Sequence, residues 1–112
     1  MDTFEILSQL CSAAGVSGAE GSAAKTAAKL LEKYGEVTLD NALGSVICKV
    51  GSWEDGKPVM LLDAHIDEIG MIVTYITEDG FLKISGCGGL DTRLLLAQQV
   101  TVYGKEKLTG VV

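Results

Sequence analysis

Three chemically active side chains lie close together in the sequence: His65, Asp67 and Glu68. His65 is the single histidine of the chain, and it directly follows a predicted strand at Val59 to Ala64. Ligands of α/β proteins gather beyond the carboxyl ends of strands, so a site is expected here. In extended backbone, residues two apart face the same side. His65 and Asp67 should therefore share a face, while Glu68 turns away.

An imidazole and a carboxylate on one face are typical of half of a metal site, because the carboxylate fixes the tautomer of the ring. A catalytic zinc site needs three or more protein ligands and an open position, so His65 alone does not complete one. A histidine paired with an acid for structural reasons is the alternative, and these residues leave both open. Nucleophilic catalysis has little support, since no serine lies in a G-x-S-x-G elbow. Asp67 and Glu68 face opposite sides, which argues against a glycosidase pair.

Two amphipathic helices are predicted ahead of this stretch. Asp2 and Glu5 have the spacing of a capping box before the first helix, which Gly15 should end. The same spacing recurs at residues 17–20, before an alanine-rich segment that should be helical to residue 33.

From residue 36 onward the apolar pattern alternates with a period of two, which predicts strands. The expected strands are 36–39, 45–50, 59–64, 70–77, 81–84 and 99–103. Residues 59–62 are apolar on both faces, which is typical of a central strand covered by helices. Asp-Gly pairs at 55–56 and 79–80 predict hairpin turns. The sequence therefore predicts an α/β fold with N-terminal helices packed on a mixed sheet.

The composition narrows the class of partner. The net charge is -6 and no cluster of Lys and Arg appears, which argues against nucleic acid or an anionic membrane. No apolar run approaches the roughly 20 residues of a membrane-spanning helix, so a soluble, cytoplasmic protein is expected. The three cysteines have no C-x-x-C spacing and are expected to be free thiols.

Four blocks of the sequence together resemble the glutamyl-aminopeptidase-like dinuclear metallopeptidases, a family that includes the tetrahedral and the deblocking aminopeptidases. The block A-H-I-D-E-I-G is highly specific, the first two blocks are moderately specific, and the glycine block is weak alone. The four blocks are GVSGAE at 15–20, DNALGS at 40–45, DAHIDEIGMIV at 63–73 and GGLD at 88–91 with the strand that begins at Gln99.

The resemblance implies that His65 is a ligand to one of two divalent ions, zinc or cobalt, and that Asp67 is the active-site acid that orients it. The family's other metal ligands and its general base come later in the chain, so residues 1–112 would be an N-terminal fragment with at most one weak partial metal site. Residues 1–71 would begin the phosphorylase/hydrolase-like catalytic domain, and residues 72–112 would open a β-rich insertion domain.

The whole enzyme is then expected to remove N-terminal residues from peptides and to form a homo-oligomer, while the fragment alone should be inactive. Two other functions are considered. Strand edges left open after Ile72 could pair with another chain, which would make this an assembly module without catalysis. A β-glucan hydrolase is the third possibility, because that activity is sometimes attached to relatives of the family.

Overall fold

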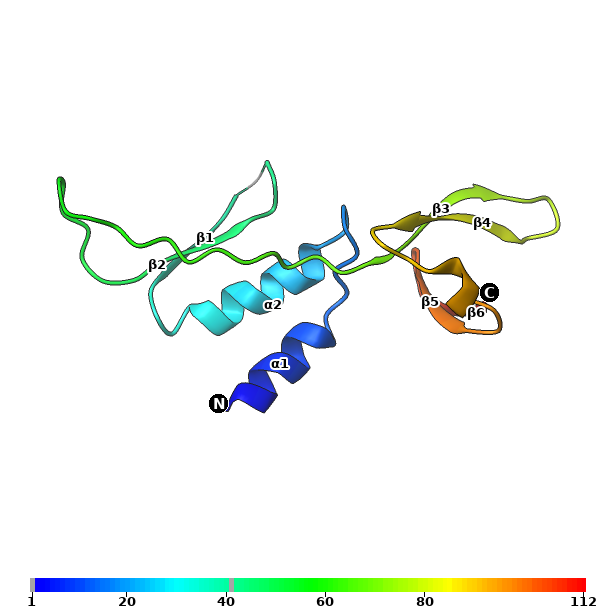
Figure 1. The fold of residues 1–112 in the computed structure, drawn as a ribbon, viewed down its shortest axis with the longest axis horizontal. Helices are drawn as coiled ribbons and strands as arrows, with labels where there is room; N and C mark the ends of the chain where they lie inside the picture. Colours follow the sequence, from blue (N-terminus) through cyan, green and yellow to red (C-terminus); the bar gives the residue numbers. More distant parts are fainter. Residues whose placement is uncertain (1, 41) are drawn as a thin grey trace.

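The computed structural model describes residues 2–40 and 42–112. The chain is elongated, with extents of 61 × 31 × 27 Å. Two helices and a first hairpin occupy one end, and two further hairpins occupy the other (Figure 1). The elements are α1 (Thr3–Cys11), α2 (Gly21–Leu31), β1 (Glu36–Leu39), β2 (Val46–Lys49), β3 (Gly70–Ile76), β4 (Leu82–Cys87), the 3-10 helix η1 (Thr92–Leu94), β5 (Gln99–Tyr103) and β6 (Lys107–Val111).

The first helix begins as its sequence predicts. The Asp2 carboxylate accepts a hydrogen bond from the Glu5 backbone N–H at 2.8 Å, and the Glu5 carboxylate accepts one from the Asp2 N–H at 3.1 Å. This reciprocal box satisfies two backbone donors that a helix start leaves free. The helix ends at Cys11, four residues before the glycine that was expected to end it.

The predicted cap of the second helix was wrong. Glu20 occupies the N-cap position of α2 and makes no side-chain capping bond. Its carboxylate instead accepts a hydrogen bond from the Gly18 backbone N–H at 2.6 Å. Gly18 has a φ of +87°, so the chain turns tightly before the helix starts, and this local turn uses the acid that a capping box would need.

The buried residues of hydrophobic type in the described part are small ones on α2: Ala23, Ala24 and Ala28. α2 packs against α1 on one side and against β1 and β2 on the other. Alanine at these positions permits close approach of the backbones, but it contributes little apolar area. Packing is also close at Gly35, where a side chain would collide with the backbone carbonyl of Lys49.

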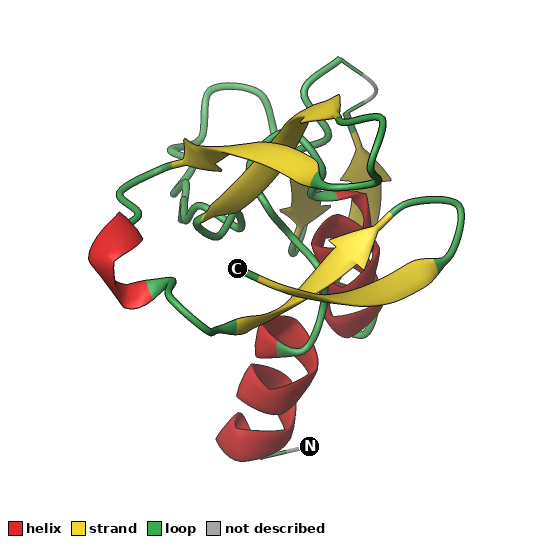
Figure 2. Ribbon diagram, turned by 90° about the vertical axis from the view of Figure 1, so that its right-hand side faces the viewer, coloured by secondary structure: helices red, strands yellow, loops and turns green. Residues whose placement is uncertain are grey.

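The predicted mixed sheet was wrong. The six strands of the described residues form three separate two-stranded antiparallel sheets, β1 with β2, β3 with β4 and β5 with β6 (Figure 2). Each is a hairpin of neighbouring strands, which a short connection can close, whereas parallel pairing needs a long crossover. One parallel contact does occur between isolated residues, the bridge between Val16 and Glu68.

The predicted central strand at residues 59–64 was also wrong in its pairing and burial. The segment runs along the long axis of the molecule in an open trace, without a ladder partner among the described residues (Figure 1). Met60, Leu61 and Leu62 are 84%, 83% and 87% exposed. A strand covered on both faces needs neighbours at both edges. Each described strand pairs within its own hairpin, so none is left to flank this segment.

The other predictions for the β region were confirmed in part. The turn at Asp79-Gly80 joins β3 to β4, with Gly80 at a φ of +85°. The turn at 55–56 forms, because the Lys57 N–H donates to the Glu54 carbonyl at 3.2 Å, but no ladder follows it. The strand at Gln99–Tyr103 has the predicted bounds. The sequence pattern missed β6 and η1.

All three cysteines are free, as predicted. None of the helices in the described ranges has both the length and the apolar character that spanning a membrane requires.

Candidate functional site

His65 and Asp67 lie on the open segment that leads from the residue 55–56 turn into β3. The imidazole Nδ1 and the Asp67 Oδ1 are 2.9 Å apart, which is hydrogen-bonding distance. The expectation that the two side chains share a face is confirmed by this contact. The His65 side chain is 85% exposed, so the rest of the ring is open to a ligand from solvent.

The pKa of Asp67 is lowered, first because its carboxylate is hydrogen-bonded to His65 and then because the Ser17 hydroxyl also bonds to it. Asp67 is therefore ionised at neutral pH and can only accept hydrogen bonds. In a neutral imidazole bonded to it, Nδ1 must carry the proton, which leaves the lone pair on Nε2. Nε2 is then the atom of this pair that can bind a metal ion.

Glu68 faces away from the pair and holds a different part of the chain. Its carboxylate Oε1 accepts a hydrogen bond from the Gly15 backbone N–H at 3.2 Å. Its own backbone N–H donates to the Gly15 carbonyl at 2.8 Å, and its carbonyl accepts from the Ser17 N–H at 3.3 Å. No local pattern could predict these bonds, because the two segments are 53 residues apart.

The open segment that carries His65 and Asp67, residues 57–69, is called the site segment below. The connector between α1 and α2, residues 12–20, lies directly against it. Val16 packs over Gly70, where a Cβ atom would come within 2.5 Å of the Val16 Cγ2. Glycine at position 70 is therefore required by this close approach. The site segment has no strand neighbour, and the connector is what holds its C-terminal part in place.

The side chains around His65 offer few ligands for a divalent metal ion. Within residues 2–40 and 42–112, no three His, Cys, Asp or Glu side chains come close enough to hold an ion. His65 offers one nitrogen, which is a suitable ligand for zinc or cobalt, and the Asp67 bond is the usual support for such a ligand. The described residues fit one ligand of a metal site and not a whole site.

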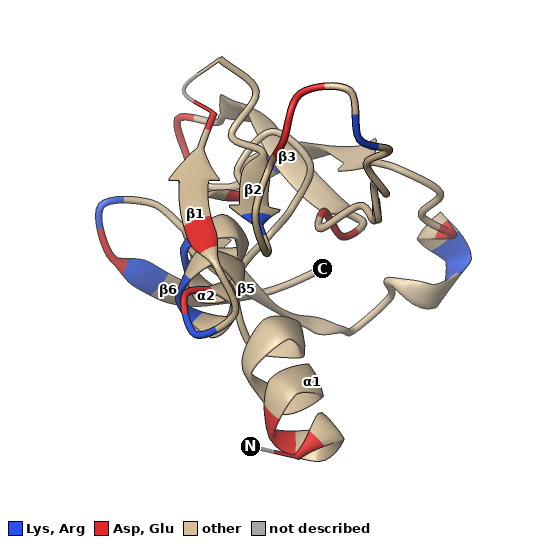
Figure 3. Ribbon diagram, turned by 90° about the vertical axis from the view of Figure 1, so that its left-hand side faces the viewer, with Lys and Arg blue, Asp and Glu red and all other residues tan. Residues whose placement is uncertain are grey.

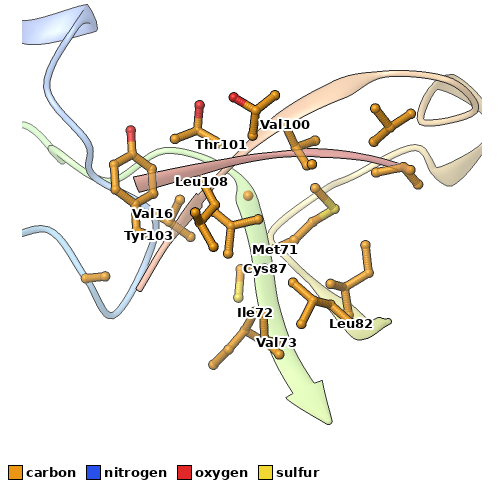
Figure 4. A pocket seen from close by; sticks show the side chains of 18 of the residues that line it. Val16, Met71, Ile72, Val73, Leu82, Cys87, Val100, Thr101, Tyr103 and Leu108 are labelled. Atoms are coloured by element: carbon orange, nitrogen blue, oxygen red, sulfur yellow. The ribbon is translucent and has the colours of Figure 1, made fainter. Parts of the chain in front are cut away.

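A cleft lies away from His65. It has a volume of about 1100 Å³ and lies between the β3–β4 and β5–β6 hairpins (Figure 4). Apolar side chains from both hairpins line it, among them Ile72, Leu82, Val100 and Leu108, and neither His65 nor Asp67 does. The cleft has no ionisable group suited to catalysis apart from the Cys87 thiol and the Tyr103 phenol, so we place the site at His65.

Charged residues are dispersed over element ends and loops in the view of Figure 3. One cluster of opposite charge is local: the Arg93 guanidinium donates to the Asp91 carboxylate at 2.9 and 2.7 Å. The pKa of Asp91 is lowered by that side-chain bond and by the Arg93 backbone N–H. Asp91 is the N-cap residue of η1, so this pair lies at the start of η1 and outside the site segment.

Solved structures share this arrangement of helices and hairpins. The TET aminopeptidase of the marine sediment archaeon Thaumarchaeota archaeon SCGC AB-539-E09 matches with a TM-score of 0.83 and 33% identity, over 96% of this chain and 30% of that one. PhTET1-12s, described as a dodecamer, matches with a TM-score of 0.83 and 32% identity, over 97% of this chain and 32% of that one. The described residues thus have the fold of part of these TET aminopeptidase structures.

Sequence relatives agree. FrvX of Escherichia coli (strain K12), whose name assigns it to the aminopeptidases, is 35% identical over 97% of this chain and 30% of its own length. The lysyl aminopeptidase of Pyrococcus furiosus is 30% identical over 92% of this chain and 29% of its own length. Residues 44–112 match the M42 glutamyl aminopeptidase family. The chain belongs to that family, and it spans about 30% of the length of the relatives it matches.

Proposed function

We propose that this chain supplies one metal ligand to a dinuclear metal-dependent aminopeptidase, which removes N-terminal residues from peptides. The observation that carries the proposal is the contact of 2.9 Å between His65 Nδ1 and Asp67 Oδ1 on an exposed segment. Membership of the M42 glutamyl aminopeptidase family supports the reaction class.

In this proposal, His65 binds one of two divalent ions, zinc or cobalt, through Nε2. Asp67 holds the proton on Nδ1 and fixes the plane of the ring, so that Nε2 keeps its lone pair for the ion. The ions of such a site supply Lewis acidity and lower the pKa of water. Asp67 is the active-site acid of the pair, and its role is to position His65.

The remaining ligands, the general base and the second ion's site would come from chain beyond the residues printed here. The described residues support this, since no three His, Cys, Asp or Glu side chains among them come close enough to hold an ion. The isolated chain of 112 residues should therefore have no aminopeptidase activity and at most weak metal binding.

We further propose two domains, with residues 1–71 in the catalytic domain and residues 72–112 in a β-rich insertion domain. The contacts between elements support this division, because α1, α2, β1 and β2 contact one another, while among the described elements β3 contacts only β4 and β5 contacts only β6. The boundary would lie inside β3, two residues after its start at Gly70.

A homo-oligomer in the cytoplasm completes the proposal. The dodecamer of PhTET1-12s supports oligomer formation, and so do the unpaired edges of the hairpins, which can pair with another chain. The same edges would serve an assembly module without catalysis. A β-glucan hydrolase has no support from the relatives described above, which are all aminopeptidases by name.

The test compares aminopeptidase activity of the printed chain with that of the chain extended by its downstream coding sequence. Activity on peptides with a free N-terminus should appear only in the extended protein and should be lost on chelation. His65→Ala should abolish it, while Glu78→Gln, which changes an exposed acid in the β3–β4 turn, should not. Full activity of the extended His65→Ala protein would refute the proposal.

A further inference from the structure

We infer that Glu68 is a positioning residue for the metal site: by accepting the Gly15 N–H, its carboxylate fixes the α1–α2 connector to the site segment and so sets the His65–Asp67 pair. The catalytic meaning of this inference rests on the proposed function. The contacts from which it is drawn do not.

The backbone N–H of Gly15 requires a hydrogen-bond acceptor. Gly15 is buried, and a buried backbone N–H without a partner destabilises a fold by about 1–3 kcal/mol. The acceptor of its N–H is the Glu68 Oε1 at 3.2 Å. Glu68 itself remains exposed at the surface. The carboxylate therefore satisfies an interior donor without paying the desolvation of a buried charge.

Few backbone hydrogen bonds join the α1–α2 connector to the site segment. Their backbone contact is a single parallel bridge, with one bond from Glu68 N–H to the Gly15 carbonyl and one from Ser17 N–H to the Glu68 carbonyl. A bridge of this length has no neighbouring ladder to support it. The side-chain bond of Glu68 to the Gly15 N–H is a third hydrogen bond between the two segments.

The orientation of Glu68 also affects that of its neighbour Asp67. Asp67 and Glu68 are adjacent in extended backbone, so their side chains project to opposite sides. Holding Glu68 against Gly15 therefore fixes the direction in which Asp67 points. Ser17, two residues after Gly15, donates its backbone N–H to the Glu68 carbonyl at 3.3 Å. The connector thus holds Glu68 through both its side chain and its backbone, and the adjacent Asp67 contacts His65.

The connector is itself fixed by packing. A Cβ on Gly15 would lie 3.0 Å from the Ala23 Cβ and 3.5 Å from the Ile66 carbonyl oxygen, so the backbone fits between α2 and the site segment. Ala23 is 3% exposed, in the small core of α2. Contacts through Gly15 and Glu68 thus connect α2 to the segment that carries the imidazole.

The experiment uses two substitutions that differ in one property. Glu68→Gln keeps an Oε1 acceptor at the same reach, and Glu68→Leu keeps similar bulk without an acceptor. Amide hydrogen exchange is measured at Gly15, and the imidazole tautomer is read from ¹⁵N-histidine spectra, which are unambiguous because His65 is the single histidine. Neither measurement needs metal or turnover, so failure of this inference is distinguishable from failure of the proposed function.

In Glu68→Leu, Gly15 should exchange about 5- to 150-fold faster, and the fraction of His65 with its proton on Nδ1 should fall. Glu68→Gln should stay within about threefold of the original protein in exchange and should keep the tautomer, because the acceptor is retained. In the extended protein, the affinity for Zn²⁺ should fall in the leucine variant and recover in the glutamine variant. An unchanged tautomer in Glu68→Leu, or equal losses in both variants, would overturn the inference.

Discussion

Replacing Gly70 by alanine tests whether the connector is packed against the site segment. The added Cβ would lie 2.5 Å from Cγ2 and 2.8 Å from Cγ1 of Val16, both well inside van der Waals contact. Overpacking of this kind costs about 1–3 kcal/mol, and the lower entropy of the unfolded alanine chain offsets about 0.4–1 kcal/mol of it. From the middle of both ranges the net loss should be about 1.3 kcal/mol, which corresponds to about 9-fold faster opening of the contact.

The assay is hydrogen exchange at the Ser17 and Glu68 amides, whose bonds form the bridge beside Gly70. Val16→Ala removes both Cγ atoms, so the double variant should recover most of the protection that Gly70→Ala loses. This coupling between the two positions is the diagnostic quantity, since it depends on their contact and not on either side chain alone.

Gly86→Ala is the matched control, because Gly86 lies in the paired strand β4 and its added Cβ would be 3.6 Å from the nearest atom, an ordinary contact. It should leave the bridge amides unchanged. Equal exchange rates in Gly70→Ala and Gly86→Ala, or no recovery in the double variant with Val16→Ala, would refute the packing of the connector on this segment.

Three further outcomes follow from the contacts described. Asp2→Ala should lower the stability of α1 by about 1 kcal/mol, seen as lost helical signal in circular dichroism, because the Glu5 backbone N–H loses the Asp2 carboxylate as its acceptor. Asp67 should titrate below 3.8 in a carboxyl NMR titration, and its midpoint should rise in His65→Ala; its stabilising contribution is present above the unfolded pKa and is lost as pH falls through the lower folded value. Gly80→Ala should destabilise the β3–β4 hairpin by about 1–2 kcal/mol in thermal unfolding, because alanine is strained at a φ of +85°.

Local signals in the sequence predicted local structure well. The box of Asp2 and Glu5 predicted the start of α1, and Asp79-Gly80 predicted the turn of the second hairpin. In each case the interacting groups are a few residues apart, so their spacing alone determines the contact. The pair of His65 and Asp67 belongs to the same class, because extended backbone brings residues two apart to one side.

The failures concern contacts between distant segments. The apolar run at residues 59–62 predicted burial, but burial depends on neighbouring strands, and these are absent from the described residues. The bond from Gly15 to Glu68 could not be predicted either, because nothing in the composition of the two segments pairs them. Before the second helix, the spacing of residues 17–20 predicted a bond between the Glu20 side chain and the Ser17 N–H. Glu20 instead accepts from the Gly18 N–H, and a local turn replaces the capping box.

The central claim is that Asp67 holds the proton on Nδ1 of His65 and leaves Nε2 free for a metal ion. The most direct test is ¹⁵N-histidine NMR of the chain during titration with Zn²⁺, above about pH 8, where an ordinary histidine is neutral. We expect a protonated Nδ1 in the free chain and a zinc-dependent change at Nε2, with Asp67→Asn weakening both. A proton on Nε2 before zinc is added, or zinc bound at Nδ1, would contradict it.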